Sequence, residues 1–265
     1  MDTASTRASL AWLLTSAVGS ALAAIVVTGV VAGRLGAPIA GWWLLGAGLL
    51  GALSRLLAIT RGRWALDWVE LAAALISFAA IGGTGLALAR PALLPLGFSV
   101  DAVHHTQLIA WMAEHRALPS PGGDTQGLLG EMTAYPVGLA LVVLAAASGS
   151  GRPLLETTYP TVALLGGLIA AVVVLISNAA ARSELKKENA ESKKYRSQNI
   201  LSFLALLIGP LLLLAHRTYL MEAYIDHSYY TMVLGILLVL LAAAWLVVEP
   251  PRSIGALAQF GLVLA

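Results

Sequence analysis

The chain has 265 residues, of which 58% are hydrophobic and only 11% are charged. An ordinary soluble domain carries about 25% charged residues, so this composition excludes a soluble globular protein. The chain has no cysteine, which excludes disulfides, thiolate metal sites and thiol nucleophiles. The net charge of +2 reflects lysines and arginines beside membrane segments, and we expect no nucleic-acid partner.

Apolar runs of the length that crosses a membrane recur along the whole chain. A helix needs about 20 apolar residues to cross roughly 30 Å of hydrocarbon. The runs are continuous rather than alternating, which favours helices over barrel strands. The first run is too long for a signal peptide, and we interpret it as a retained anchor. The predicted spans are residues 10–31, 39–58, 69–88, 159–181, 200–215 and 231–248.

The topology depends on residues 136–147, an apolar segment that is too short to span. If this segment is re-entrant or lies along the interface, most of the 16 lysines and arginines fall on the side of the N-terminus. The positive-inside rule favours that arrangement, with a cytoplasmic N-terminus. The basic segment 182–199 is then cytoplasmic, either as a solvated helix or loop or as a contact for lipid headgroups or a partner.

The sequence therefore predicts an all-α integral membrane protein, placed in a bacterial inner membrane, with about seven to eight transmembrane helices. We expect one polytopic domain over residues 1–265. It comprises three N-terminal spans (1–94), an extracytoplasmic loop with amphipathic and re-entrant helices (95–158), and C-terminal spans (159–265). The last apolar stretch has no closing polar flank, so we expect either a truncated product or a fragment of a longer protein. At the cytoplasmic end of the third span, Asp67 and Glu70 are expected to pair with Arg61 or Arg63.

Chemistry is expected in the polar stretch 99–135. Asp101, His104 and His105 stand at i, i+3 and i+4, so a helix places them on one face, with His115 further along the same side. This group could bind a phosphate or a divalent metal, for which Asp101, His104 and His105 are the candidate ligands. Alternatively, Asp101 caps the helix while the histidines form hydrogen bonds at the level of the lipid headgroups.

A second polar stretch, residues 216–230, falls on the same side of the membrane in this topology. Its tyrosines fit an interfacial belt. Asp226 is harder to explain in that way, because a carboxylate close to hydrocarbon is costly unless it is used or paired. Tyr135 precedes Pro136 where a new helix enters the interface, and anchoring is the simplest explanation for it.

The order of these motifs resembles the GT-C glycosyltransferase superfamily, which are polytopic enzymes that use polyprenyl-phosphate-linked sugars. The matching pieces are DAVHH (101–105) with the helix and loop after it, YPVG (135–138) and YIDH (224–227). They cover roughly residues 98 to 235. This chain departs from the pattern of the superfamily in having two extra spans before the acidic loop.

The resemblance implies that Asp101 serves as a base or metal ligand and that Asp226 is a second acidic position. In such an enzyme the carrier lipid lies between helices, and Asp101 takes the proton of an acceptor hydroxyl, directly or through a divalent metal. The expected substrate and phosphate contacts are His104, His105, Tyr135, Arg217 and His227.

Two further functions remain open from the sequence. One is a non-catalytic membrane scaffold or accessory subunit that keeps such a fold and works with a protein partner or a missing C-terminal half. The other is a transporter, for which paired broken helices and charges near the middle of the membrane are expected. Pro210 is the only convincing break in the middle of a predicted span.

Overall fold

The computed structural model describes residues 8–60, 64–88, 100–120, 124–188, 207 and 230–248. This part of the chain is almost entirely helical and contains five helices that are long and apolar enough to cross a membrane. The protein is therefore an integral membrane protein. The predicted span 200–215 and the apolar stretch 254–265 lie outside the described residues. The five long helices are α1 (Leu10–Arg34), α2 (Gly41–Thr60), α3 (Trp68–Leu88), α7 (Leu154–Glu188) and α9 (Tyr230–Val248).

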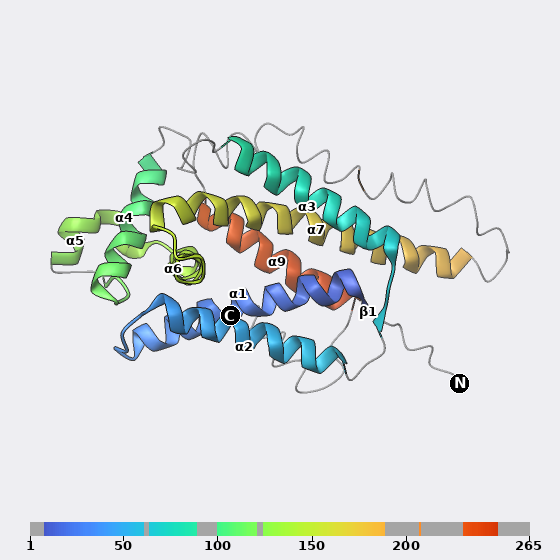
Figure 1. Cartoon of the computed structure of the whole chain (residues 1–265), viewed down its shortest axis with the longest axis horizontal. Helices are drawn as coiled ribbons and strands as arrows, with labels where there is room; N and C mark the ends of the chain where they lie inside the picture. Colours follow the sequence, from blue (N-terminus) through green and yellow to red (C-terminus); the bar gives the residue numbers. More distant parts are fainter. Residues whose placement is uncertain are drawn as a thin grey trace.

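The long helices lie side by side, with α3 packed on α7, α7 on α9, and α1 on α2 and α9 (Figure 1). The pair α3 and α7 is antiparallel, because Glu70 at the start of α3 contacts Asn178 late in α7. Gly85 near the end of α3 meets Ala163 early in α7. Helix α3 therefore ends, and α7 begins, at the same end of the bundle, which we call the α6 end. The opposite end is called the Glu70 end.

Four short elements gather at the α6 end (Figure 1). They are α4 (Val100–His115), α5 (Asp124–Leu129), the 3-10 helix η1 (Gly130–Ala134) and α6 (Gly138–Ser150). Figure 1 looks along α6, whereas the five long helices run across the view. We expected the segment 136–147 not to span the membrane. Most of it belongs to α6, and this helix runs across the direction of the five long helices. At 1.5 Å per residue its length is only about 20 Å.

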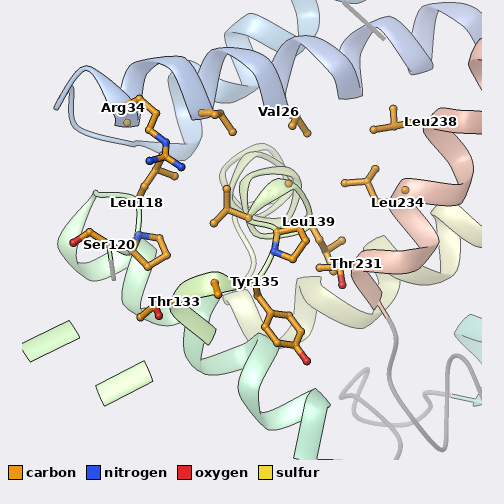
Figure 2. Close-up of a pocket in the computed structure, with 18 residues that line it drawn as sticks. Val26, Arg34, Leu118, Ser120, Thr133, Tyr135, Leu139, Thr231, Leu234 and Leu238 are labelled. Carbon is orange, nitrogen blue, oxygen red and sulfur yellow. The ribbon is translucent and has the colours of Figure 1, made fainter. Parts of the chain in front are cut away.

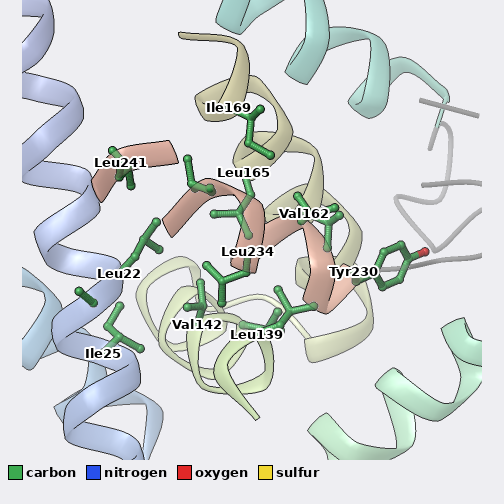
Figure 3. Packing of buried hydrophobic residues seen from close by; sticks show 14 of the residues in the cluster. Leu22, Ile25, Leu139, Val142, Val162, Leu165, Ile169, Tyr230, Leu234 and Leu241 are labelled. Atoms are coloured by element: carbon green, nitrogen blue, oxygen red, sulfur yellow. The ribbon is translucent and has the colours of Figure 1, made fainter. Parts of the chain in front are cut away.

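Helix α6 is enclosed by other helices. Residues 139–145 are all buried, as expected for a helix that is apolar on every side. It contacts α1, α2, α4, α7 and α9. Figure 3 shows how its side chains meet those of the long helices to form the core. This core contains Leu22 and Ile25 of α1, Leu139 and Val142 of α6, Val162, Leu165 and Ile169 of α7, and Leu234 and Leu241 of α9.

Small residues let α3 and α7 approach each other closely. A Cβ atom added to Gly167 of α7 would lie 2.8 Å from the carbonyl oxygen of Phe78 in α3. Glycine and alanine at such crossings are typical of helix packing in membranes, where dispersion contacts replace the hydrophobic effect as the main attraction.

All seven tryptophans lie in the described part of the chain, in two groups. Trp42 and Trp43 begin α2, and Trp111 lies in α4, so these three belong to the α6 end. The other four are at the Glu70 end: Trp12, Trp64, Trp68 and Trp245. Trp12 and Trp245 are buried inside the bundle, whereas Trp42 and Trp68 are exposed at opposite ends of it, which is the pattern of the aromatic belts that mark the two membrane interfaces.

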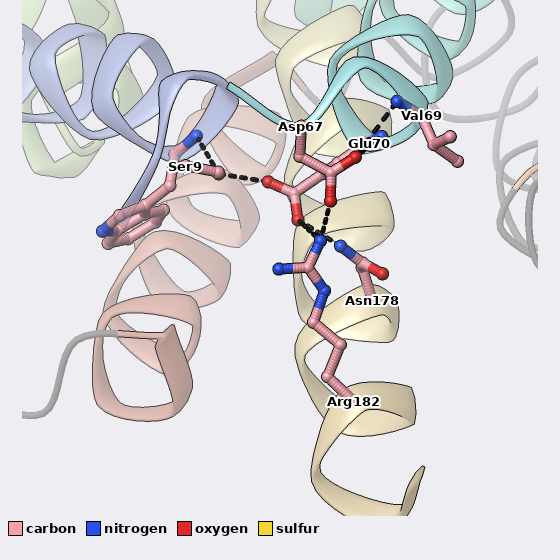
Figure 4. Close-up of polar contacts among 7 residues, drawn as sticks. Ser9, Asp67, Val69, Glu70, Asn178 and Arg182 are labelled. Atoms are coloured by element: carbon pink, nitrogen blue, oxygen red, sulfur yellow. Dashed lines mark hydrogen bonds and ion pairs between the residues drawn. The ribbon is translucent and has the colours of Figure 1, made fainter. Parts of the chain in front are cut away.

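A polar cluster joins α3 to α7 at the Glu70 end (Figure 4). Asp67 caps α3, because its Oδ1 accepts hydrogen bonds of 3.1 Å from the backbone N–H groups of Val69 and Glu70. Arg182 of α7 pairs with Asp67 and lies 3.7 Å from Glu70 Oε2. The sequence predicted Arg61 or Arg63 as the partner; both lie outside the described residues, and the described partner is Arg182.

Glu70 is buried and has two further partners in this cluster. Its carboxylate accepts hydrogen bonds from the hydroxyl of Ser9 and from the side-chain amide of Asn178. Ser9 belongs to the strand β1 (Ala8–Ser9), which pairs in parallel with β2 (Trp64–Ala65) just before α3. The start of α1 is thereby tied to the start of α3.

Arg55 of α2 is also buried at the Glu70 end, with 3% of its surface exposed. Its guanidinium carbon lies 4.3 Å from the ring centroid of Trp245 and 6.0 Å from that of Trp12. Its Nε donates a 3.1 Å hydrogen bond to the Ser16 hydroxyl. Contacts to α1 and α9 therefore hold this charge at a depth where an exposed arginine would be costly.

Candidate functional site

Helix α4 presents one face to the bundle at the α6 end. Ala102, His105, Leu108, Ile109 and Met112 are buried on it. The sequence placed Asp101, His104, His105 and His115 on one face of this helix; of these, His105 lies on the buried face, whereas His104 is half-buried and His115 is exposed. Because α4 lies across the ends of the long helices (Figure 1), this face covers the bundle.

The three histidines of α4 have different surroundings. His105 is buried and points into the protein, whereas His104 is half-buried. His115, at the end of the helix, is exposed and stacks on Trp111 with 4.4 Å between ring centroids. Its Nδ1 lies 3.0 Å from the Trp111 carbonyl oxygen. The three rings therefore do not face one common site.

An aromatic cluster surrounds His105, and we define it as His105, Tyr135, Tyr159 and Tyr230. The ring of His105 lies 5.7 Å from Tyr135 and 5.6 Å from Tyr230, between centroids. Tyr230 lies 6.4 Å from Tyr159 in an edge-to-face arrangement. The cluster joins α4, the turn before α6, α7 and α9. It adds aromatic contacts to the apolar packing of α4 on α6 and α7.

A cavity of about 740 Å³ opens next to this cluster (Figure 2). Its volume lies within the roughly 300–1,000 Å³ that is usual for ligand sites. One wall comes from the end of α1, another from the start of α9, and the remainder from the segments on either side of α5 and η1 and from the start of α6. Tyr135 belongs both to the aromatic cluster and to the lining of this cavity.

The lining is divided between apolar and polar side chains. Val26 and Val30 of α1 and Leu234 and Leu238 of α9 supply apolar surface. Figure 2 places Val26 of α1 above α6 and Leu234 and Leu238 of α9 to one side of it, with Ser120, Thr133 and Tyr135 on the opposite side of the cavity from Val26. The polar groups are the guanidinium of Arg34 and the hydroxyls of Ser120, Thr133, Tyr135 and Thr231. A cavity of this kind suits a molecule with an apolar body and a polar head.

The structure brings only some of the predicted site residues together. Asp101 is the second residue of α4, four residues before His105 and so on the same side of the helix, but its side chain is outside the described part. Arg217, Asp226 and His227 lie outside the described residues altogether. Among the residues that are described, no group of three or more histidine, aspartate or glutamate side chains could hold a metal ion.

The cavity includes polar residues that the sequence analysis did not select. Arg34 looked like an ordinary basic residue after a first membrane span, and Ser120, Thr133 and Thr231 like ordinary polar residues of loops and helix ends. One signal was present: Val26, Val30 and Arg34 follow each other at i, i+4 and i+8 and therefore share one face of α1.

The comparisons with known proteins leave the family open: no family model, no curated protein and no solved structure matches this chain.

Proposed function

We propose that the protein is a membrane glycosyltransferase of the GT-C type. It would transfer a sugar from a polyprenyl-phosphate carrier to an acceptor hydroxyl on the extracytoplasmic side. The observation that carries this proposal is the cavity at the α6 end, where an apolar wall from two long helices meets hydroxyls and one guanidinium. A polyprenyl-phosphate sugar has the matching division into an apolar tail and a polar head.

In the proposed membrane arrangement, the N-terminus and the Glu70 end face the cytoplasm, and the α6 end faces the opposite side. Helix α6 would then dip into the membrane from that side, shielded by its neighbours. Two observations support this arrangement. The five described long helices pass between two levels of tryptophan, and α3 ends where α7 begins.

Asp101 is the proposed base. It stands one helical turn before His105, whose ring packs against Tyr135 in the lining of the cavity. The acceptor oxygen would attack the anomeric carbon as its proton passes to the Asp101 carboxylate, and the carrier phosphate would leave. Direct displacement inverts the anomeric centre. Asp226, His104, His227 and Arg217 are the further proposed contacts. A divalent metal remains an expectation from the resemblance, and we assign no step to it.

The test compares Asp101→Asn with Glu114→Gln, which changes an exposed acid on the same helix. The full chain is placed in lipid nanodiscs with a panel of polyprenyl-phosphate sugars and a panel of acceptors that carry free hydroxyl groups, and the released polyprenyl phosphate and the glycosylated acceptor are measured by mass spectrometry. Loss of a general base costs about 10²–10⁴-fold in rate. We expect that loss for Asp101→Asn and near-normal release for Glu114→Gln.

Two outcomes contradict the proposal in different ways. Normal release by Asp101→Asn removes this aspartate from the mechanism. No release by the unmodified chain over the whole panel removes the transferase itself. A stoichiometric protein partner that copurifies in mild detergent would then support the accessory-subunit alternative.

A further inference from the structure

We infer that Arg34 binds the phosphate of a membrane lipid in the cavity at the α6 end, and that α1 is part of this binding site. The inference deepens the proposed function and rests on it for the class of lipid, a polyprenyl phosphate. It assigns a working role to α1, the first of the three long helices that precede the acidic loop.

The first observation is the charge of the cavity. Arg34 is the only charged side chain among the 18 residues that line it. Within the described part of the chain, it forms no ion pair. Figure 2 shows its guanidinium turned from the end of α1 toward Leu118, on the side of the cavity where Ser120 lies. Arg34 is an exposed residue that also lines the cavity. The helix dipole favours a cation at this position.

The second observation is the set of neutral groups around this cation. Four hydroxyl side chains line the same cavity, those of Ser120, Thr133, Tyr135 and Thr231, and the lining residues that the structure describes include no carboxylate. The Thr133 hydroxyl donates to the Gly130 carbonyl oxygen at 3.1 Å, so the other three hydroxyls are the candidate donors. A hydroxyl can donate to a phosphate oxygen, and a guanidinium binds phosphate through paired N–H donors. The lining therefore favours an anion.

The third observation is the apolar part of the lining, which distinguishes a lipid phosphate from a free phosphate ion. Val26 and Val30 on α1, and Leu234 and Leu238 on α9, are spaced at i and i+4 and form two apolar ridges. Gly235 lines the cavity too, and a Cβ atom added there would meet no atom within 4 Å. This open apolar space is where the first isoprene units of the tail would lie.

The first experiment measures binding by the full chain in detergent, with farnesyl phosphate as the probe and farnesol as the neutral analogue. Losing a charge-assisted contact should weaken farnesyl phosphate binding of Arg34→Gln by about tenfold or more. Binding of farnesol should be unchanged. Arg34→Lys should retain part of the affinity. The matched control is Arg152→Gln, an exposed arginine at the same end that pairs with Glu156 at 3.4 Å.

The second experiment fills the cavity instead of removing the charge. Gly235→Leu should abolish binding of farnesyl phosphate and of farnesol, because the leucine occupies the space for the tail. Gly83→Leu is the matched control, since Gly83 is exposed on α3 and a Cβ there also meets no atom within 4 Å. Both variants should keep the unfolding temperature of the unmodified chain, so a loss of binding reports on the cavity and not on folding.

The results also separate this inference from the proposed transferase. If Arg34→Gln binds farnesyl phosphate as tightly as the unmodified chain does, the inference is wrong even where sugar transfer is observed. If inorganic phosphate displaces the probe at similar concentrations, the site recognises phosphate alone, and the lipid part of the inference is wrong. Arg34-dependent binding without any sugar transfer supports the inference and counts against the transferase.

Discussion

His105 and Tyr230 pack with 5.6 Å between their ring centroids and 31° between their planes. The contact joins α4 to the first residue of α9. Because His105 also contacts Tyr135, it links the start of a long helix to the lining of the cavity. Together with the buried Leu108, Ile109 and Met112, this pair fixes α4 against the bundle, and Asp101 stands one turn before His105.

Replacing His105 with alanine should loosen α4 from the bundle. His105 is only 3% exposed, and its ring contacts two other rings. Removing a buried ring of this kind costs about 2–3 kcal/mol in the free energy of unfolding. The measurement is the thermal unfolding midpoint in detergent. His104→Ala is the matched control on the neighbouring, half-buried position, and equal losses for the two variants would contradict the role of the cluster.

Glu70→Gln tests the polar cluster at the other end. The glutamine still accepts a hydrogen bond from Ser9, but it no longer balances the charge of Arg182. We expect a loss of about 1–2 kcal/mol, since a hydrogen bond to a charged group is worth about that much and Arg182 is partly exposed to solvent.

The control for Glu70→Gln is Glu156→Gln, which removes an exposed pair with Arg152. Exposed pairs contribute about 0–1 kcal/mol, so this variant should unfold near the temperature of the unmodified chain. A smaller loss for Glu70→Gln than for Glu156→Gln would show that the buried cluster does not stabilise the packing of α3 on α7.

The five long helices could be predicted from the sequence, because hydrocarbon demands a continuous apolar run. The run 69–88, for example, corresponds to α3 within one residue. Helix α7 was predicted to begin at residue 159 but begins at Leu154. Thr157 and Thr158 made this turn look polar, yet each hydroxyl donates to a carbonyl four residues earlier, so they continue the helix without needing water.

The candidate site was predictable only in part. A helical face with His105 follows from spacing within one segment, but its contact with Tyr230 joins distant parts of the chain and leaves no local pattern. In the sequence, Arg55 is one of the 16 lysines and arginines that entered the topology argument only by their charge. Its burial between Trp12 and Trp245 depends on the packing of three helices. Arg34 also looked like a basic residue beside a membrane span, because the cavity that it lines is formed by segments far apart in the sequence.

Gly167→Ala should destabilise the protein although alanine favours a helix. The new methyl group would lie 2.8 Å from the Phe78 carbonyl oxygen, and a backbone atom cannot move without shifting α3. Such overpacking costs about 1–3 kcal/mol. Gly46→Ala in α2 is the opposite case, since a Cβ there meets no atom within 4 Å, and it should be neutral or stabilising. Thermal unfolding in detergent compares the two, and changes of the same sign would contradict the close approach of α3 and α7.

Trp245→Leu and Trp245→Phe test how the bundle accommodates a buried arginine. The guanidinium of Arg55 lies over the Trp245 ring at 4.3 Å, and a desolvated cation–π contact is worth about 2 kcal/mol. Leucine removes the aromatic face, whereas phenylalanine keeps one, so the leucine variant should lose more stability. Trp42→Leu, at an exposed tryptophan, should change the unfolding midpoint little in detergent. If the two Trp245 variants lose equal stability, packing volume and not the aromatic face is what Trp245 contributes beside Arg55.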